Sequence, residues 1–219
     1  MPVICKLFPG VLLLFSLPVS AKQPELSHET LSAAYTASYQ LEKKRDYKGA
    51  MHALNPVMKA YPSGYTVNYR SGWLAYCDSN YTDAFSFLRK AQLVCPSSLE
   101  ILNCLTLVHA AKEEWTNVEK EALKALKIDY YNSIANYWYA RSLMINGKYK
   151  LSEEVSRKML AVFPTSVLFL STLGETLYAA KKYDESKEIF LSCIILDPYN
   201  ESAKKYLQLF EKRGKGHRQ

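Results

Sequence analysis

Residues 167–200 read VLFLSTLGETLYAAKKYDESKEIFLSCIILDPYN, and this stretch decides the fold. Apolar residues recur every three or four positions up to Leu177, and the spacing resumes at Tyr183 after the polar pair KK. Such spacing places the apolar side chains on one face of a helix on each side of the break. Pro198 lacks an N–H and disfavours helix in the residue before it, so it ends the second helix. The stretch predicts two amphipathic helices joined by a short turn.

The pattern recurs every 34 residues, and a fixed period of this length indicates a repeat architecture. Five windows fit, at residues 31–64, 65–98, 99–132, 133–166 and 167–200. The seventeenth position is aromatic in every window, and the thirty-second is proline in four of them: Tyr47, Tyr81, Trp115, Tyr149 and Tyr183; Pro62, Pro96, Tyr130, Pro164 and Pro198. The eighth and twentieth positions hold small or short side chains: Ser38, Gly72, Thr106, Ala140 and Gly174; Ala50, Ala84, Val118, Ser152 and Ser186.

Each recurring position has a mechanical purpose. Small residues at the eighth and twentieth positions let the two helices of a window approach closely. The aromatic residue begins the second helix and can cover the apolar joint, while proline separates one window from the next. We therefore expect an all-α chain built as a stack of five helix pairs.

The last window resembles the tetratricopeptide repeat (TPR) family. At its pattern positions this family usually has an apolar or aromatic residue, Leu, Gly, Tyr, Phe and Pro, in that order. The last window holds Leu170, Leu173, Gly174, Leu177, Phe190 and Pro198 at these positions, and Ser186 where Ala is usual. Other windows depart further, because Asn68 and Asn136 fill an early large apolar position and His109 takes the tyrosine position. The resemblance covers residues 31–200 and implies a right-handed α-solenoid of five helix-turn-helix repeats. It indicates no particular partner, because one fold serves many functions.

The segments that flank the repeats have different characters. Residues 201–213 predict one more amphipathic helix, with Tyr206, Leu207 and Phe210 on one face, and such a helix can cap a stack. Residues 22–30 form a leader, and residues 214–219 form a basic tail.

The first 21 residues have the layout of a secretory signal peptide. Lys6 precedes an apolar run that ends at Leu17, and small residues lead to Ala21. The run is too short to span a bilayer, although an uncleaved anchor or a buried helix is the alternative interpretation. We expect cleavage after Ala21 and export, to the periplasm or out of the cell.

Export would permit disulfides among the remaining cysteines. Cys95 and Cys104 flank one predicted turn and are the pair expected if any bond forms. Free buried thiols are the simpler interpretation, also for Cys77 and Cys193.

Composition and motifs favour binding over catalysis. The 219 residues carry a net charge of +7, which favours acidic partners or anionic surfaces only weakly. The four histidines make no metal-ligand spacing with one another or with cysteine, and no glycine loop that could hold phosphate occurs. We expect neither enzyme activity nor a metal or cofactor.

The resemblance also implies where a partner would bind. First helices line the concave surface of such stacks, at the second, fifth, ninth, twelfth and thirteenth positions of each window. The candidate groove residues chosen from these positions are Tyr35, Tyr39, Tyr69, Trp73, Tyr76, Asn103, Tyr137, Arg141, Glu175 and Tyr178. The same positions include Glu42, Glu100, Leu107 and Ile134. Tyrosine and tryptophan are enriched at binding hot spots, but packing between repeats would use them equally well.

Three functions remain open at this point. The first is an exported scaffold that binds a protein or peptide segment in the groove, within an envelope or secretion assembly. The Lys–Asn clamp that some repeats use for chaperone tails is absent, since Tyr35, Tyr39 and Arg70 stand in the matching places. The second is adhesion to anionic lipid, polysaccharide or nucleic acid through basic residues such as Lys212 and Arg213, with nucleic acid the least favoured. The third is carbohydrate binding on the aromatic side chains.

Overall fold

A computed structural model describes residues 25–216, so the predicted signal peptide, part of the leader and the end of the tail lie outside the described residues. Within that range the secondary structure consists of helices and turns alone. The helices are α1 (His28–Lys43), α2 (Tyr47–Ala53), α3 (Asn55–Ala60), α4 (Tyr65–Cys77), α5 (Tyr81–Val94), α6 (Leu99–Ala111), α7 (Trp115–Ile128), α8 (Ser133–Ile145), α9 (Tyr149–Val162), α10 (Val167–Ala179), α11 (Tyr183–Leu196) and α12 (Glu201–Gly216).

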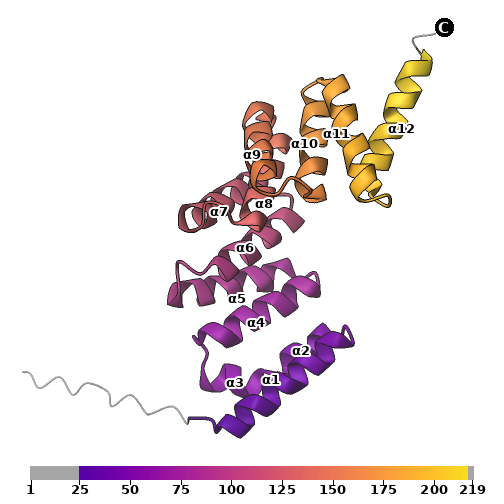
Figure 1. Ribbon diagram of the computed structural model, residues 1–219. Coiled ribbons are helices and arrows are strands. Elements are labelled where there is room, and N and C mark those ends of the chain that lie inside the picture. The colour runs from indigo at the N-terminus through magenta and orange to yellow at the C-terminus, as the bar shows by residue number, and fades with distance from the viewer. Residues whose placement is uncertain (1–24, 217–219) are drawn as a thin grey trace, which may run out of the picture.

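The helices pack in chain order into an elongated, curved stack (Figure 1). The first helices of successive pairs are α1, α4, α6, α8 and α10, and each of the last four begins at the first position of its window. Every second helix begins at the aromatic seventeenth position. The chain is therefore an all-α repeat solenoid, and its first helices lie next to one another along the stack.

The close contact predicted within each helix pair is present. All five residues at the twentieth position are 0% exposed. A Cβ atom added to Gly72 would lie 2.7 Å from Leu88 Cγ, and one added to Gly174 would lie 2.8 Å from Phe190 Cε1. In the last pair Ser186 Oγ donates to the Gly174 carbonyl (2.8 Å), which ties the two positions together. The small residues thus set the distance between paired helices.

The turn within each pair is a repeated left-handed helix end. Its fifteenth-position residues have φ between 56° and 75°: Arg45, Ser79, Glu113, Gly147 and Lys181. The next N–H bonds back five residues, as from Lys182 N to Leu177 O (2.9 Å), which is the Schellman arrangement. Four of the five residues are not glycine, although the left-handed region costs such residues about 1–2 kcal/mol. Helix packing therefore imposes this turn where the sequence carries no glycine signal.

The first repeat departs from the predicted pair of helices. Its second helix is broken at Leu54 into α2 and α3. Pro56 explains the break, because it has no N–H to continue the helical ladder and its ring crowds the carbonyl four residues earlier.

Two buried asparagines hold the joints between repeats. Asn68 Nδ2 donates to the Pro62 carbonyl (3.0 Å), and Asn136 Nδ2 donates to the Tyr130 carbonyl (2.9 Å). At the joint between the third and fourth repeats, Lys158 Nζ also donates to Asn136 Oδ1 (2.6 Å) and lies 3.9 Å from the centre of the Tyr130 ring. These contacts explain why asparagine fills an apolar position, and how Tyr130 can stand in the place of proline.

The C-terminal helix covers the end of the stack. α12 extends three residues beyond the predicted segment, to Gly216. Tyr206 stacks on the Phe190 ring at 4.7 Å and meets Tyr178 at 4.9 Å, and Phe210 lies 5.5 Å from Tyr178. This aromatic cluster buries the apolar end of the last repeat.

The cysteines in the described residues are free thiols. Cys95 is exposed and Cys104 is buried, and no disulfide joins them. The expectation of buried thiols therefore describes Cys104 and Cys193, whereas Cys77 is half-buried and Cys95 is exposed.

We expect Gly174→Ala to lower the free energy of unfolding by about 1–2 kcal/mol. The new methyl group would overlap the buried Phe190 ring, and this loss exceeds the gain in helix propensity that alanine brings, about 1 kcal/mol. Urea denaturation measures the change.

Phe190→Leu removes the ring atoms that cause the overlap, so the two substitutions together should cost less than their sum. Additive effects, or a Gly174→Ala variant as stable as the parent, would show that the close contact does not limit the packing.

Candidate functional site

One hollow is built by first helices alone, and we call it the first-helix hollow. It has a volume of about 560 Å³ and is lined by Tyr39, Glu42, Tyr69, Arg70, Trp73, Glu100, Asn103, Cys104, Leu107 and Ile134. These residues come from α1, α4, α6 and the start of α8 (Figure 1). Four of the ten predicted groove residues therefore meet here: Tyr39, Tyr69, Trp73 and Asn103.

A polar network fixes the aromatic walls of this hollow. Arg70 Nη1 donates to Glu42 Oε2 (2.7 Å), and Trp73 Nε1 donates to Glu42 Oε1 (2.7 Å). The Arg70 guanidinium also bonds to Ser38 Oγ (3.2 and 3.3 Å) and lies 3.8 Å from the centre of the Tyr39 ring. Arg70 is only 5% exposed, so these contacts supply the partners that a buried cation needs. The network joins α1 to α4 and holds the Tyr39 and Trp73 rings in place.

Two groups that line the hollow, those of Tyr69 and Cys104, stay uncharged at neutral pH. Burial, with smaller contributions from Cys104 and Glu100, raises the pKa of Tyr69 to about 12. Burial also raises the pKa of the Cys104 thiol to about 11. Both groups therefore keep their protons at physiological pH and do not act as anions.

The remaining predicted groove residues lie elsewhere. Tyr35 lines a smaller hollow of about 260 Å³ between α1, α3 and α4. The Tyr76 ring packs on Trp73 (5.7 Å) and on Tyr81 (5.9 Å). Tyr178 packs against the capping helix, where Tyr206 lies 4.9 Å away.

A second charged cluster joins α8, α10 and α12. Arg141 Nη1 donates to Glu175 Oε2 (3.1 Å), and Ser202 Oγ donates to Glu175 Oε1 (2.6 Å). Arg141 also lies 5.7 Å from the Tyr137 ring. Both oxygens of Glu175 are therefore bonded, and this cluster is closed by the capping helix.

The sixth position of the window was missed by the sequence pattern. Arg70 and Cys104 occupy it, and both line the hollow beside the fifth-position residues Tyr69 and Asn103. Adjacent helix residues are about 100° apart, so the sixth position borders the same face and could have been included.

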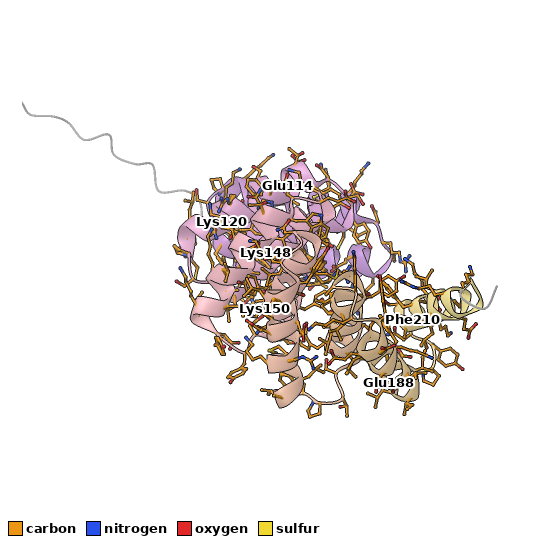
Figure 2. All side chains as sticks on the ribbon, turned by 90° about the horizontal axis from the view of Figure 1, so that it is seen from above. Glu114, Lys120, Lys148, Lys150, Glu188 and Phe210 are labelled. Atoms are coloured by element: carbon orange, nitrogen blue, oxygen red, sulfur yellow. The ribbon has the colours of Figure 1, made fainter. Side chains whose placement is uncertain are left out.

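The outer surface carries a basic hollow of about 610 Å³, the lysine hollow. It is lined by Thr116, Glu119, Lys120, Leu123, Lys124, Lys127, Asn146 and Lys148. Figure 2 labels two of these, Lys120 on α7 and Lys148 in the turn before α9. Lys148 pairs with Glu119 (2.8 Å), whereas Lys120 and Lys127 make no ion pair with the described residues.

The described residues contain no cluster of three or more metal-ligating side chains. No helix between residues 25 and 216 has the length and apolar character that a membrane span requires.

Comparison with known proteins identifies the fold. No protein-family model and no curated protein matches the chain. A tetratricopeptide repeat protein from Parabacteroides merdae is similar with a TM-score of 0.78, covering 87% of this chain and 76% of its own, at 19% identity. MamA gives 0.69 over 78% of this chain and 94% of its own, at 18% identity. YrrB, described as a TPR protein with an unusual peptide-binding site, gives 0.67 over 78% and 89%, at 14% identity. Identities this low show a shared fold and nothing about a shared partner.

We expect Glu42→Ala to lower the free energy of unfolding by about 2 kcal/mol, because Arg70 would stay buried without its partner. Glu42→Gln keeps the shape and should cost less. Denaturation by urea measures both variants.

The matched control is Lys182→Ala, which removes an ion pair to Glu153 (2.8 Å) from a lysine that is 51% exposed. That change should cost less than about 0.5 kcal/mol. Equal costs for the two alanine variants would show that the network does not stabilise the α1–α4 contact.

Proposed function

We propose that this chain, which has the tetratricopeptide repeat fold, is a protein-interaction scaffold that holds a peptide segment in the first-helix hollow. The observation that carries the proposal is the hollow itself. Tyr39, Tyr69 and Trp73 from two adjacent helices line one concavity, and the Glu42–Arg70 pair fixes its wall. Such aromatic side chains bring large contact area at a small entropic cost.

Support for a peptide ligand comes from the shape of the first-helix surface and from a protein with a similar structure. First helices of successive repeats form a continuous surface, which suits an extended or helical segment. YrrB, which shares the fold, is described as having a peptide-binding site. The proposal is for binding rather than catalysis, since the charged pair in the hollow is bonded to itself.

We further propose that the scaffold acts after export, in an envelope or secretion assembly. The signal-peptide layout of the first 21 residues supports this compartment.

Peptides selected from a displayed random library on the purified protein should lose about tenfold or more in affinity for Tyr69→Ala or Trp73→Ala. Trp73→Ala also removes a bond to Glu42, so Tyr69→Ala is the cleaner variant. Circular dichroism checks that helicity is intact. Calorimetric titration measures the affinities.

Tyr199→Ala is the matched control, because Tyr199 is 81% exposed at the joint before α12. If the control weakens binding as much as Tyr69→Ala, or if neither groove variant weakens it, the ligand does not bind in the first-helix hollow.

A second candidate function is adhesion to an anionic surface through the lysine hollow. Lys120 and Lys127 leave two charges uncompensated beside the apolar Leu123. Anionic surfaces attract such residues at low ionic strength. The basic residues of α12 and the tail, which first motivated this function, are a separate source of charge.

Lys120→Glu with Lys127→Glu should abolish sedimentation with vesicles that contain phosphatidylglycerol and leave the weaker background on phosphatidylcholine vesicles unchanged. Added salt should weaken the wild-type binding in the same way. Lys48→Glu with Lys59→Glu changes the net charge equally on the exposed surface of the first repeat and serves as the control. Binding that is lost only on truncation after Glu211 would assign adhesion to the tail instead.

A further inference from the structure

We propose that the first-helix hollow recognises a cationic side chain of its peptide partner, with arginine preferred. This inference rests on the proposed peptide-binding function and adds the chemistry of the ligand.

The charges of the hollow leave a net negative site. Three charged residues line it, namely Glu42, Arg70 and Glu100. Glu42 and Arg70 neutralise each other at 2.7 Å, and both Glu42 oxygens are occupied, one by Arg70 and one by Trp73. Glu100 makes no ion pair with any residue in the described part of the chain. One uncompensated carboxylate therefore remains.

A buried acceptor adds to this charge. Asn103 Oδ1 is shielded from solvent and has no hydrogen-bond partner in the described residues. Asn103 lies one helical turn after Glu100 on α6, and both side chains line the hollow. Buried acceptors without partners are rare in folded proteins, so an unpaired oxygen beside a carboxylate points to a ligand that brings N–H donors.

The aromatic walls favour the same ligand. The faces of tyrosine and tryptophan rings carry negative potential and attract ammonium and guanidinium groups. The hollow itself already contains this geometry, where the Arg70 guanidinium covers the Tyr39 ring at 3.8 Å. Tyr69 and Trp73 offer further rings beside Glu100 and Asn103. Arginine suits the site better than lysine, because its planar group can stack on a ring and donate to a carboxylate at once.

The second charged cluster contains a first-helix carboxylate that is closed to a ligand. Glu175 occupies the first-helix surface of the last repeat, but Arg141 and Ser202 bond both of its oxygens. Glu100 lacks such partners among the described residues, so of these two first-helix carboxylates Glu100 is the one that can bind a ligand cation. A peptide that presents a carboxylate there would be repelled.

The test uses four capped peptides, acetyl-Gly-Leu-Xaa-Leu-Gly-amide, in which Xaa is arginine, lysine, citrulline or glutamate. Citrulline has nearly the shape of arginine without its charge. Titrations of the isotope-labelled full chain, followed by amide chemical shifts, give the affinities. We expect the arginine peptide to bind about tenfold more tightly than the citrulline peptide, with lysine between them and glutamate weakest.

Two substitutions distinguish specific recognition of the arginine side chain from nonspecific peptide binding. Glu100→Gln should remove most of the preference for arginine over citrulline, and Asn103→Asp should increase it several-fold by adding a second carboxylate. Glu188→Gln is the control, because Glu188 is exposed on α11, away from the hollow (Figure 2). It should leave the preference unchanged.

Equal affinity for the arginine and citrulline peptides, with shifts at Trp73 and Tyr69, would overturn this inference and leave peptide binding in the hollow standing. A preference for arginine that persists in Glu100→Gln would also overturn it. Absence of shifts in the hollow for every peptide, together with failure of library selection to yield hollow-directed ligands, would overturn the proposed function as well.

Discussion

The close contact between the two helices of each pair is the constraint on which the rest of the structure depends. Gly72 and Gly174 leave no room for even one methyl group, and the facing twentieth positions are fully buried. Because this contact recurs at a fixed interval, each pair presents its first helix toward the same side of the stack. Side chains that lie 28 or more residues apart in sequence, such as Glu42 and Arg70, can then share one hollow. The binding surface is a consequence of the spacing between helices.

The hollow has fixed aromatic walls and also contains acceptor groups that lack hydrogen-bond partners within residues 25–216. Glu42 accepts hydrogen bonds from Arg70 and Trp73, and these bonds hold the aromatic walls in place. The charges of Glu42 and Arg70 neutralise each other. Glu100 and Asn103 are not satisfied in the same way. A site with fixed walls and open acceptors selects ligands by what they donate, and binds them without first reorganising its own side chains.

The periodic features of the fold could be predicted from the sequence, whereas its contacts between repeats could not. The aromatic seventeenth positions and the small eighth positions marked the helix starts and the close contacts. The left-handed turns could not be predicted from the sequence, because four of the five positions hold a residue other than glycine: Arg45, Ser79, Glu113 and Lys181. Pro56 does carry a signal for the broken helix, because proline disfavours the interior of a helix. In the sequence, Arg70 shows only a mismatch with the chaperone-tail clamp, because its pairing with Glu42 depends on how two repeats stack. Tyr178 was placed in the groove, but the capping helix packs on it.

The central claim is that ligand binds on the first helices α1, α4 and α6. Amide hydrogen exchange of the full chain, with and without a saturating library-selected peptide, tests it most directly. Binding in the hollow predicts slower exchange in α1, α4 and α6, with no change in the second helices α7, α9 and α11. Protection confined to those second helices, or spread evenly over the stack, would contradict it.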